Sequence, residues 1–264
     1  MFFWREQIEG GDRPGPAGAP PPGGHPGPAH GSGVDWGFTS TGRGAGRGEY
    51  GAFNLGGHVG DDAGAVESNR SELARAVGVP RSRLLFMNQV HGTDVVRVDG
   101  PWDGAAPAAD GLVTTDPDLA LAVLVADCVP VLLADVGRGV VGVLHAGRPG
   151  MIGGIVARGL KAMAQAGARD VRAAVGPSIC ARCYEVPASM RDEAAAVSPA
   201  SAAVSWTGTP AIDVGAGVVD QLAREGVPLT WVPGCTRETP HLYSYRRAAR
   251  TGRFAGVVRA WSAA

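Results

Sequence analysis

The sequence lacks three features that would point to a membrane, to export or to a disulfide framework. No apolar run reaches the roughly 18 residues of a membrane-spanning helix, because the longest, residues 119–134, is interrupted by Asp127 and Pro130. Residues 1–6 lack the basic segment and apolar core of a secretion signal. Four cysteines among 264 residues are too few for a disulfide scaffold of this size. These absences predict a cytoplasmic protein with free thiols.

The chain also lacks a surplus of charge of either sign. Lys and Arg together number 24 and Asp and Glu 25, which gives a net charge of −1. Nucleic acids and anionic membranes are bound through a basic field, so neither is an expected partner. Small molecules or proteins are better candidates. The composition leaves the oligomeric state open between a monomer and a weak homodimer.

One large domain is expected to follow a glycine- and proline-rich stretch. Residues 10–33 are almost entirely Gly, Pro, Ala, Ser and His, a composition that cannot bury enough apolar surface to become ordered. We therefore predict an N-terminal segment, residues 1–33, with a flexible stretch, and a catalytic domain over residues 34–264. With 45% hydrophobic residues, a domain of this length can build a full core.

Strand-like and helix-like patterns alternate throughout the larger segment. Short apolar runs bounded by turn residues predict strands at residues 34–40, 84–87, 95–98, 109–116, 119–125, 131–134, 140–144, 171–175, near 212, 229–232 and 254–258. Apolar residues at helical spacing predict helices at residues 63–76, 150–166, 188–196 and 215–224. The expected fold is a single mixed α/β (α+β) domain, with mixed β-sheets flanked by helices.

Three soft or borderline metal ligands adjoin these predicted strands. His91, Cys128 and His145 each directly follow or end an apolar run, so their side chains could meet at one rim of a sheet. One thiolate and two imidazoles suit zinc or copper, and three protein ligands leave a coordination position open for chemistry. Buried structural roles are the alternative for each residue alone.

Other polar residues invite weaker interpretations. Asp127, directly before Cys128, could orient a ligand or accept a proton, or simply cap a turn. Cys180 and Cys183 form a Cys-x-x-Cys pair, but no second pair or nearby histidine completes a zinc knuckle and Cys235 is remote in the sequence. Structural or incidental thiols are therefore the favoured interpretation of these three cysteines.

A series of short motifs runs in order from about residue 34 to the C-terminal region. They are Phe38-Thr39, Asn54-Leu55-Gly56, His58-Val59-Gly60-Asp61, Asn69-Arg70, Gln89-Val90-His91-Gly92, Ala109-Asp110-Gly111-Leu112-Val113-Thr114, Ala126-Asp127-Cys128-Val129-Pro130-Val131, His145-Ala146-Gly147, Gly176-Pro177-Ser178-Ile179, Cys183-Tyr184-Glu185-Val186, Ser244-Tyr245-Arg246-Arg247 and Thr251-Gly252-Arg253. Together they resemble the laccase-domain family, also called YfiH-like polyphenol oxidases and described as purine nucleoside phosphorylases.

The resemblance implies a YfiH-like fold with zinc bound by His91, Cys128 and His145. It also implies phosphate-dependent cleavage of purine nucleosides to the free base and ribose 1-phosphate. Adenosine, inosine, guanosine and methylthioadenosine are candidate substrates, and adenosine deamination is a sister activity, so the enzyme would be a glycosyltransferase and a hydrolase. An open zinc position can activate water or position phosphate, and the sequence does not choose between them.

Candidate substrate contacts are less secure than the metal ligands. Asn54, in the motif Asn-Leu-Gly, is expected to hydrogen-bond the base or ribose. Phosphate needs cations and backbone amides, which the glycine-rich turn at residues 147–154 and several arginines offer: Arg148, Arg246, Arg247 and Arg253. The family commonly reads Ala-Gly-Trp-Arg-Gly where this chain has Ala146-Gly147-Arg148-Pro149-Gly150, so an aromatic residue is missing and the arginine is shifted.

Two other functions remain open. Cys128 with His91 or His145 as base could form the nucleophilic pair of a metal-independent hydrolase. Related bacterial proteins are linked to peptidoglycan quality control and to cell-division genes, which would make the substrate a cell-wall precursor. Copper oxidase chemistry is not expected, because multicopper oxidases arrange many histidines in His-x-His pairs and these six histidines contain none.

Overall fold

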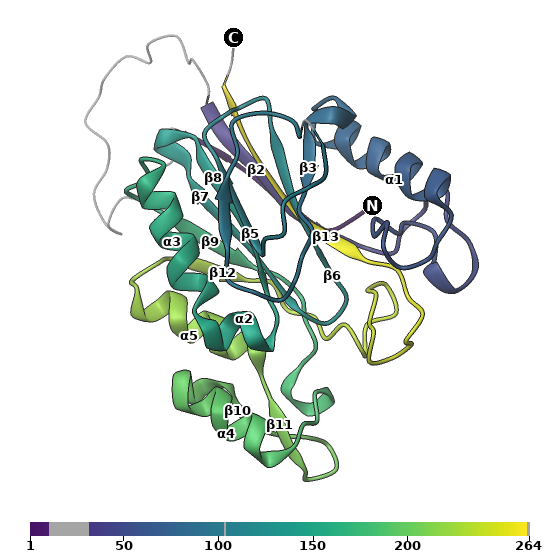
Figure 1. Cartoon of the computed structure of the whole chain (residues 1–264), viewed down its shortest axis with the longest axis vertical. Helices are drawn as coiled ribbons and strands as arrows, with labels where there is room; N and C mark the ends of the chain where they lie inside the picture. Colours follow the sequence, from purple (N-terminus) through teal and green to yellow (C-terminus); the bar gives the residue numbers. More distant parts are fainter. Residues whose placement is uncertain (11–31, 103, 263–264) are drawn as a thin grey trace, which may run out of the picture.

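Two β-sheets pack face to face in the computed structural model, which describes residues 1–10, 32–102 and 104–262 (Figure 1). The first sheet has five strands in the order β1 (Phe2–Glu9), β2 (Ser32–Thr39), β13 (Phe254–Ser262), β6 (Ala120–Val125) and β3 (Leu84–Phe86). The second has six strands in the order β12 (Leu229–Trp231), β9 (Arg172–Val175), β7 (Val129–Asp135), β8 (Val140–Ala146), β5 (Gly111–Thr114) and β4 (Val95–Arg97). Both sheets mix parallel and antiparallel pairs.

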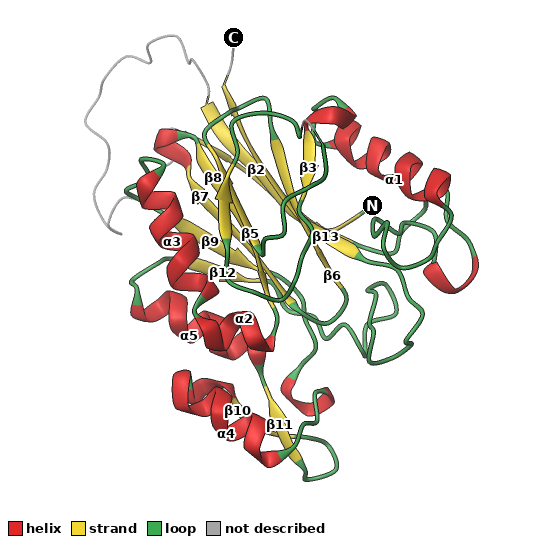
Figure 2. Cartoon of the chain, in the orientation of Figure 1, coloured by secondary structure: helices red, strands yellow, loops and turns green. Residues whose placement is uncertain are grey.

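Helices cover the outer faces of this sandwich (Figure 2). The described α-helices are α1 (Ala63–Ala76), α2 (Arg148–Gly153), α3 (Ile155–Gln165), α4 (Ala188–Val197) and α5 (Val214–Arg224), and all but α4 lie against the two large sheets. Short 3-10 turns lie at η1 (Gly48–Tyr50), η2 (Arg81–Arg83), η3 (Val136–Arg138), η4 (Ala181–Cys183) and η5 (Pro199–Ser201). Helix α4 packs with a two-stranded ribbon, β10 (Ala202–Val204) and β11 (Pro210–Ile212), at the lower end in Figure 1.

Side-chain alternation along the strands divides the interior into layers. In β6, Leu121 and Val123 join the core between the sheets, whereas Ala120 and Ala122 join the cluster beneath α1. In β8, Val141 and Val143 belong to the core between the sheets, and Leu144 belongs to the cluster beneath α3 and α5. Successive strand residues point to opposite faces. His145 therefore shares the face of Val141 and Val143 and points between the sheets.

Two chain segments cross from one sheet to the other at the rim where the functional residues lie. Residues 87–94 connect β3 of the first sheet with β4 of the second, and residues 126–128 connect β6 with β7. The first segment carries His91 and the second carries Asp127 and Cys128. The sandwich thereby brings together residues from distant strands at one edge.

The mixed α/β fold and most of the predicted elements are confirmed. Helix α1 has the predicted bounds and is capped at its N-terminus by Asp62, whose carboxylate accepts the amide of Ala65. The single helix expected over residues 150–166 is instead two helices, because Gly154 adopts a left-handed φ of 87° between them. None of the described helices has the length and apolarity to cross a membrane.

The beginning of the chain contributes a strand that the sequence patterns did not predict. Strand β1 pairs antiparallel with β2, and the ring of Trp4 stacks on that of Phe38 with centroids 5.7 Å apart. The first sheet therefore includes residues on the N-terminal side of the expected boundary at residue 33. Of the predicted flexible stretch, residues 11–31 lie outside the described residues.

The core between the sheets provides a stability prediction. Leu132 is fully buried there, so Leu132→Ala should lower the free energy of unfolding by about 2–5 kcal/mol through lost burial and a residual cavity. Urea unfolding measures the loss. Val204→Ala, at a side chain 57% exposed, is the control and should change stability by less than about 0.5 kcal/mol. Equal effects of the two substitutions would contradict the proposed packing.

Candidate functional site

His91, Cys128 and His145 meet at the crossover rim. One potential ligand atom from each lies within 4.8 Å of the others. The Sγ atom of Cys128 is 3.8 Å from Nε2 of His91, and the two imidazole rings pack edge to face with centroids 4.8 Å apart. His145 is 3% exposed, whereas His91 reaches solvent. The three side chains predicted from the sequence thus form one group that opens to one side.

Asp110, a fully buried carboxylate, organises this group. Its Oδ1 atom is 2.7 Å from Nδ1 of His145 and accepts the amide of His91 at 3.0 Å. Its Oδ2 atom accepts the amides of Gly92 at 2.6 Å and Val90 at 3.3 Å. Asp110 therefore fixes the ring of one ligand and the backbone of another. The hydrogen bond at Nδ1 leaves Nε2 of His145 available to a metal ion, an arrangement typical of histidine ligands.

Two residues of the site have strained backbone conformations. Among the described residues, His91 (φ 61°) and Asp127 (φ 106°) are the non-glycine residues with a left-handed φ, a conformation that costs roughly 1–3 kcal/mol. The carboxylate of Asp110 holds His91 in this conformation by accepting the backbone amide of His91. The carboxylate of Asp127 accepts the hydroxyl of Thr236 at 2.6 Å and the amide of Arg246 at 2.7 Å. Hydrogen bonds from the surrounding framework therefore maintain both conformations.

The electrostatics of the metal-free group favour a thiolate beside an imidazolium. Burial opposes ionisation of Cys128, but the charge and hydrogen bond of His145 and the hydrogen bond of His91 lower its pKa to about 6. Burial opposes charge on His145 as well, yet the Cys128 thiolate and Asp110 raise its pKa to about 9. Burial also disfavours the Asp110 carboxylate, and hydrogen bonds, led by that of His145, lower its pKa nonetheless. A thiolate is the form of cysteine that binds metal or attacks an electrophile.

Gly147 allows this close packing. A Cβ atom at this position would lie 2.9 Å from Cδ2 of His91 and 3.2 Å from Sγ of Cys128. The φ of Gly147 is −76°, which any residue can adopt, so the requirement for glycine here is one of space. The motif His-Ala-Gly at residues 145–147 thus supplies one ligand and the room for the other two.

A cavity of about 570 Å³ opens over His91, Cys128 and His145, within the range of small-molecule sites. Its lining includes several cationic or aromatic side chains: His58, Arg148, Tyr184, Tyr245, Arg246 and Arg253. The guanidinium of Arg246 lies 4.7 Å from the centre of the Tyr184 ring. Burial, with the nearby charges of Arg253 and Arg70, lowers the pKa of His58. The cavity thus combines cations, flat rings and a neutral imidazole.

The remaining predicted site residues occupy different positions. Arg148 and Arg246 line the cavity, although Nη1 of Arg148 is also 3.1 Å from a carboxylate oxygen of Glu193. Asn54 is fully buried and does not belong to the lining. Its Oδ1 atom accepts the amide of Arg253 at 2.8 Å and its Nδ2 atom donates to Asp61. The geometry therefore gives Asn54 a position behind Arg253, without a direct path to a ligand.

Sequence reasoning did not identify Asp110 or His58 as site residues. Asp110 appears in the sequence as the polar end of a strand, and its role depends on amides 18 to 20 positions away. His58 lies in a glycine-rich loop whose path the sequence patterns do not determine. The signal that could have singled out Asp110 is its place directly before an apolar strand, a position where a carboxylate reaches the rim of a sheet.

The role of Asp110 can be tested by isosteric substitution. Asp110→Asn removes the negative charge beside His145, so affinity for a metal at the His91, Cys128 and His145 group should fall by roughly 10–100-fold. Competition with a chromophoric chelator measures the change. Asp99→Asn, at a side chain 72% exposed, is the control. Unchanged affinity in a folded Asp110→Asn protein would contradict the role assigned to this carboxylate.

The lowered pKa of Cys128 predicts its pH dependence. In metal-stripped protein, alkylation of Cys128 should be fast at pH 7 and should decline as the pH falls through about 6, where the thiolate becomes protonated. Peptide mass spectrometry after iodoacetamide treatment identifies the labelled cysteine. Cys183 is the internal control, because burial and neighbouring thiols raise its pKa to about 12 and it should stay unlabelled at pH 7. Cys128 labelling that rises only near pH 9 would contradict the assigned electrostatics.

Comparison with known proteins places this geometry in a family. A purine nucleoside phosphorylase of Streptomyces coelicolor is 52% identical over 231 residues, which cover 86% of this chain and 96% of the relative. One of Mycobacterium tuberculosis is 50% identical over 212 residues, covering 79% and 85%. The crystal structure of YlmD from Geobacillus stearothermophilus superposes with a TM-score of 0.79 at 31% identity, covering 86% of this chain and 92% of that chain.

A family model described as multi-copper polyphenol oxidoreductase laccase matches residues 35–260. The matched segment contains the group of His91, Cys128 and His145, together with Asp110 and the whole cavity lining. The names of the relatives support an enzyme. The extent of these matches shows that the chain belongs to the laccase-domain family of YfiH-like proteins.

Proposed function

We propose that this protein is a zinc-dependent purine nucleoside phosphorylase. The observation that carries the proposal is the cavity itself, in which three potential metal ligands lie beside arginines and tyrosines. Relatives about 50% identical to this chain carry the name purine nucleoside phosphorylase. Adenosine, inosine, guanosine and methylthioadenosine are the candidate substrates. Adenosine deamination is a second candidate activity at the same site.

The donor set favours zinc. One thiolate and two imidazoles with an open side match catalytic zinc sites, and the hydrogen bond between His145 and Asp110 fixes the ring as zinc sites usually do. Copper oxidases need several histidine-rich centres, and the described residues contain one group with histidine ligands. When bound, zinc would supply a Lewis acid that polarises an oxygen of phosphate or water.

The cavity side chains can perform the remaining tasks of phosphorolysis. In this reaction a phosphate oxygen forms a bond to C1′ of the ribose while the bond from C1′ to the purine nitrogen breaks, and the electron pair leaves with the purine. Arg148, Arg246 and Arg253 can bind the phosphate anion. The rings of Tyr184 and Tyr245 can stack on the purine. The neutral imidazole of His58 can accept a proton from a phosphate hydroxyl and pass it to the departing purine nitrogen.

Asp127 and Asn54 support these groups in the proposed mechanism. Asp127 lines the cavity, but its two oxygens already accept hydrogen bonds from Thr236 and Arg246. We therefore favour an orienting role for this carboxylate over the role of a general base. Asn54, expected from its motif to bind the base or ribose, would act instead through the backbone of Arg253.

One observation favours a second candidate function. The pair formed by the Cys128 thiolate and the His145 imidazolium, with Asp110 behind the histidine, is also the arrangement of thiol hydrolases that use no metal. Under that hypothesis alkylation of Cys128 would abolish activity in metal-free protein. Under the phosphorylase hypothesis metal-free protein is already inactive.

The direct test is product analysis with a metal-ligand variant. Purified protein incubated with zinc, phosphate and each candidate nucleoside should release free base and ribose 1-phosphate. Chromatography and mass spectrometry detect both products. His91→Asn retains a residue suited to a left-handed backbone but removes the imidazole, and it should lower kcat/KM by at least about 100-fold. The exposed His241→Ala is the matched histidine control.

Controls within the same assay separate the candidate reactions. Product formation that requires phosphate indicates phosphorolysis, whereas ammonia released without phosphate indicates deamination. Nucleotide-linked muropeptides serve as the alternative substrates of a cell-wall role. If zinc is bound and no nucleoside yields product at high enzyme concentration, the phosphorylase proposal is wrong.

A further inference from the structure

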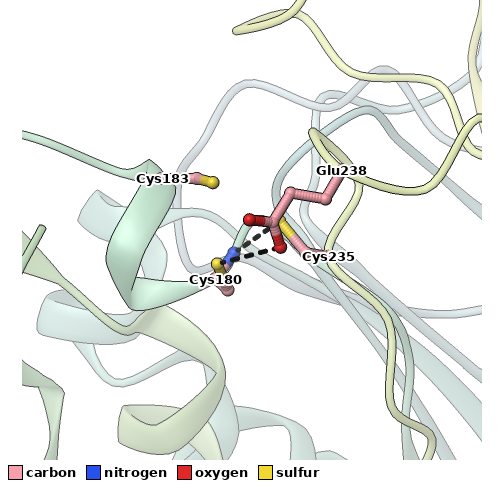
Figure 3. A group of neighbouring side chains, drawn as sticks. All are labelled: Cys180, Cys183, Cys235 and Glu238. Atoms are coloured by element: carbon pink, nitrogen blue, oxygen red, sulfur yellow. Dashed lines mark hydrogen bonds between the residues drawn. The ribbon is translucent and has the colours of Figure 1, made fainter. Parts of the chain in front are cut away.

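A second group of potential metal ligands, three thiols and a carboxylate, lies outside the cavity lining. Cys180, Cys183, Cys235 and Glu238 gather around one point, and one potential ligand atom from each lies within 4.8 Å of the others (Figure 3). In the sequence, Cys235 is remote from the Cys-x-x-Cys pair, so no further ligand is predicted to complete the pair. The fold changes that interpretation, because it completes the pair with two further ligand atoms from a different loop.

Two turns of the same length build this group. In η4 the amide of Cys183 donates to the carbonyl of Cys180 at 3.0 Å, and in the loop after β12 the amide of Glu238 donates to the carbonyl of Cys235 at 3.2 Å. Each turn therefore offers two ligands separated by two residues, as in zinc knuckles. An isolated bridge between Ser178 and Cys235 holds the two turns side by side.

Further contacts direct the side chains toward a common centre. The amide of Cys180 donates to Sγ of Cys235 at 3.4 Å, and the thiol of Cys180 lies 3.9 Å from Oε2 of Glu238. The indole N–H of Trp206 donates to Oε1 of Glu238 at 3.2 Å, which orients the carboxylate and leaves its second oxygen toward the thiols. Figure 3 shows the sulfur of Cys183 pointing toward the same space.

We propose that Cys180, Cys183, Cys235 and Glu238 bind a zinc ion at a second, structural site of this protein. Sulfur ligands about 2.3 Å from a zinc ion lie about 3.8 Å apart at the corners of a tetrahedron, and a carboxylate oxygen about 2.0–2.2 Å from the ion lies slightly closer to them. The ligand atoms here need to close by about an ångström at most to reach that geometry. Four protein ligands leave no open position, so the ion would stabilise structure and take no part in a reaction.

The site would secure two segments that shape the cavity. Thr236, the neighbour of one ligand, donates its hydroxyl to Asp127 at 2.6 Å. Tyr184, the neighbour of another, lines the cavity wall. A zinc ion between these loops would fix the strained Asp127 and the tyrosine relative to each other. The proposal concerns metal binding and does not depend on the activity proposed above.

Metal analysis of the full chain tests the proposal. In a Cys128→Ser background, which disables the cavity site, zinc-loaded and desalted protein should retain about one zinc ion per chain. Adding Cys183→Ser should reduce the retained zinc to a small fraction of that. His91→Asn provides an alternative background if Cys128→Ser does not fold, as judged by circular dichroism.

A milder variant guards against loss of folding. Glu238→Gln keeps all three thiols but removes the carboxylate, and it should weaken zinc binding by at least about tenfold. That is the lower end of the loss seen when a residue that only supports a metal ligand is removed. The exposed Glu225→Gln is the matched control and should bind as the background does. Competition with a chromophoric chelator measures both affinities.

Thiol titration distinguishes zinc binding from a disulfide. Metal-stripped Cys128→Ser protein, denatured without reductant, should show all three of its remaining thiols. Loss of two thiols that reductant restores would indicate a disulfide in place of the metal and would overturn the proposal. Folded background protein with all three thiols free and no retained zinc would overturn it as well.

Discussion

The buried carboxylate of Asp110 is the interaction on which the functional rim depends. A charged group without solvent is costly unless hydrogen bonds compensate for it, and here the imidazole of His145 and three consecutive amides, of residues 90–92, provide them. Through these hydrogen bonds, the carboxylate fixes the position of the strained loop at residues 90–92 relative to His145 at the end of β8. The position of the histidines, and with them the charge state of Cys128, follows from this single buried group.

The two-sheet architecture explains why such a group can form at all. His91 and Cys128 lie on segments that leave one sheet and enter the other, so their side chains meet where the sheets come together. His145 reaches the same place because strand alternation directs it to the inner face of β8. Each of the two connecting segments, residues 87–94 and 126–128, is held at both ends by strands of different sheets.

Sequence patterns predicted what depends on local structure. The bounds of α1 follow from helical spacing and a capping aspartate, and the central strands follow from uninterrupted apolar runs. The three side chains of the rim were identified because a thiol and two imidazoles adjoin apolar runs, and because the resemblance of the surrounding motifs implied a shared zinc site. Strand β1 was missed because its two-residue alternation is broken by Phe3 and by Glu6, whose carboxylate accepts the indole N–H of Trp36 across the sheet.

Features that depend on contacts between distant parts of the chain could not be predicted from the sequence. The role of Asp110 requires the path of the β3–β4 loop, and Cys235 approaches Cys180 only through the strand order of the second sheet. Asn54 has a sequence context that suggests ligand binding, yet burial assigns its amide to the backbone of Arg253. A polar residue in a glycine-rich loop can satisfy either a ligand or the protein itself, and only tertiary structure distinguishes the two.

The central position of β13 has a consequence for how the protein is made. This strand, residues 254–262, lies between β2 and β6, with Gly256 opposite both Phe38 and Val123. Synthesis proceeds from the N-terminus, so β2 and β6 must wait for a partner that follows them by more than a hundred residues. Until then both strands present unpaired, largely apolar edges. The first sheet, and the cavity wall that includes Arg253, can therefore close only after β13 has been synthesised.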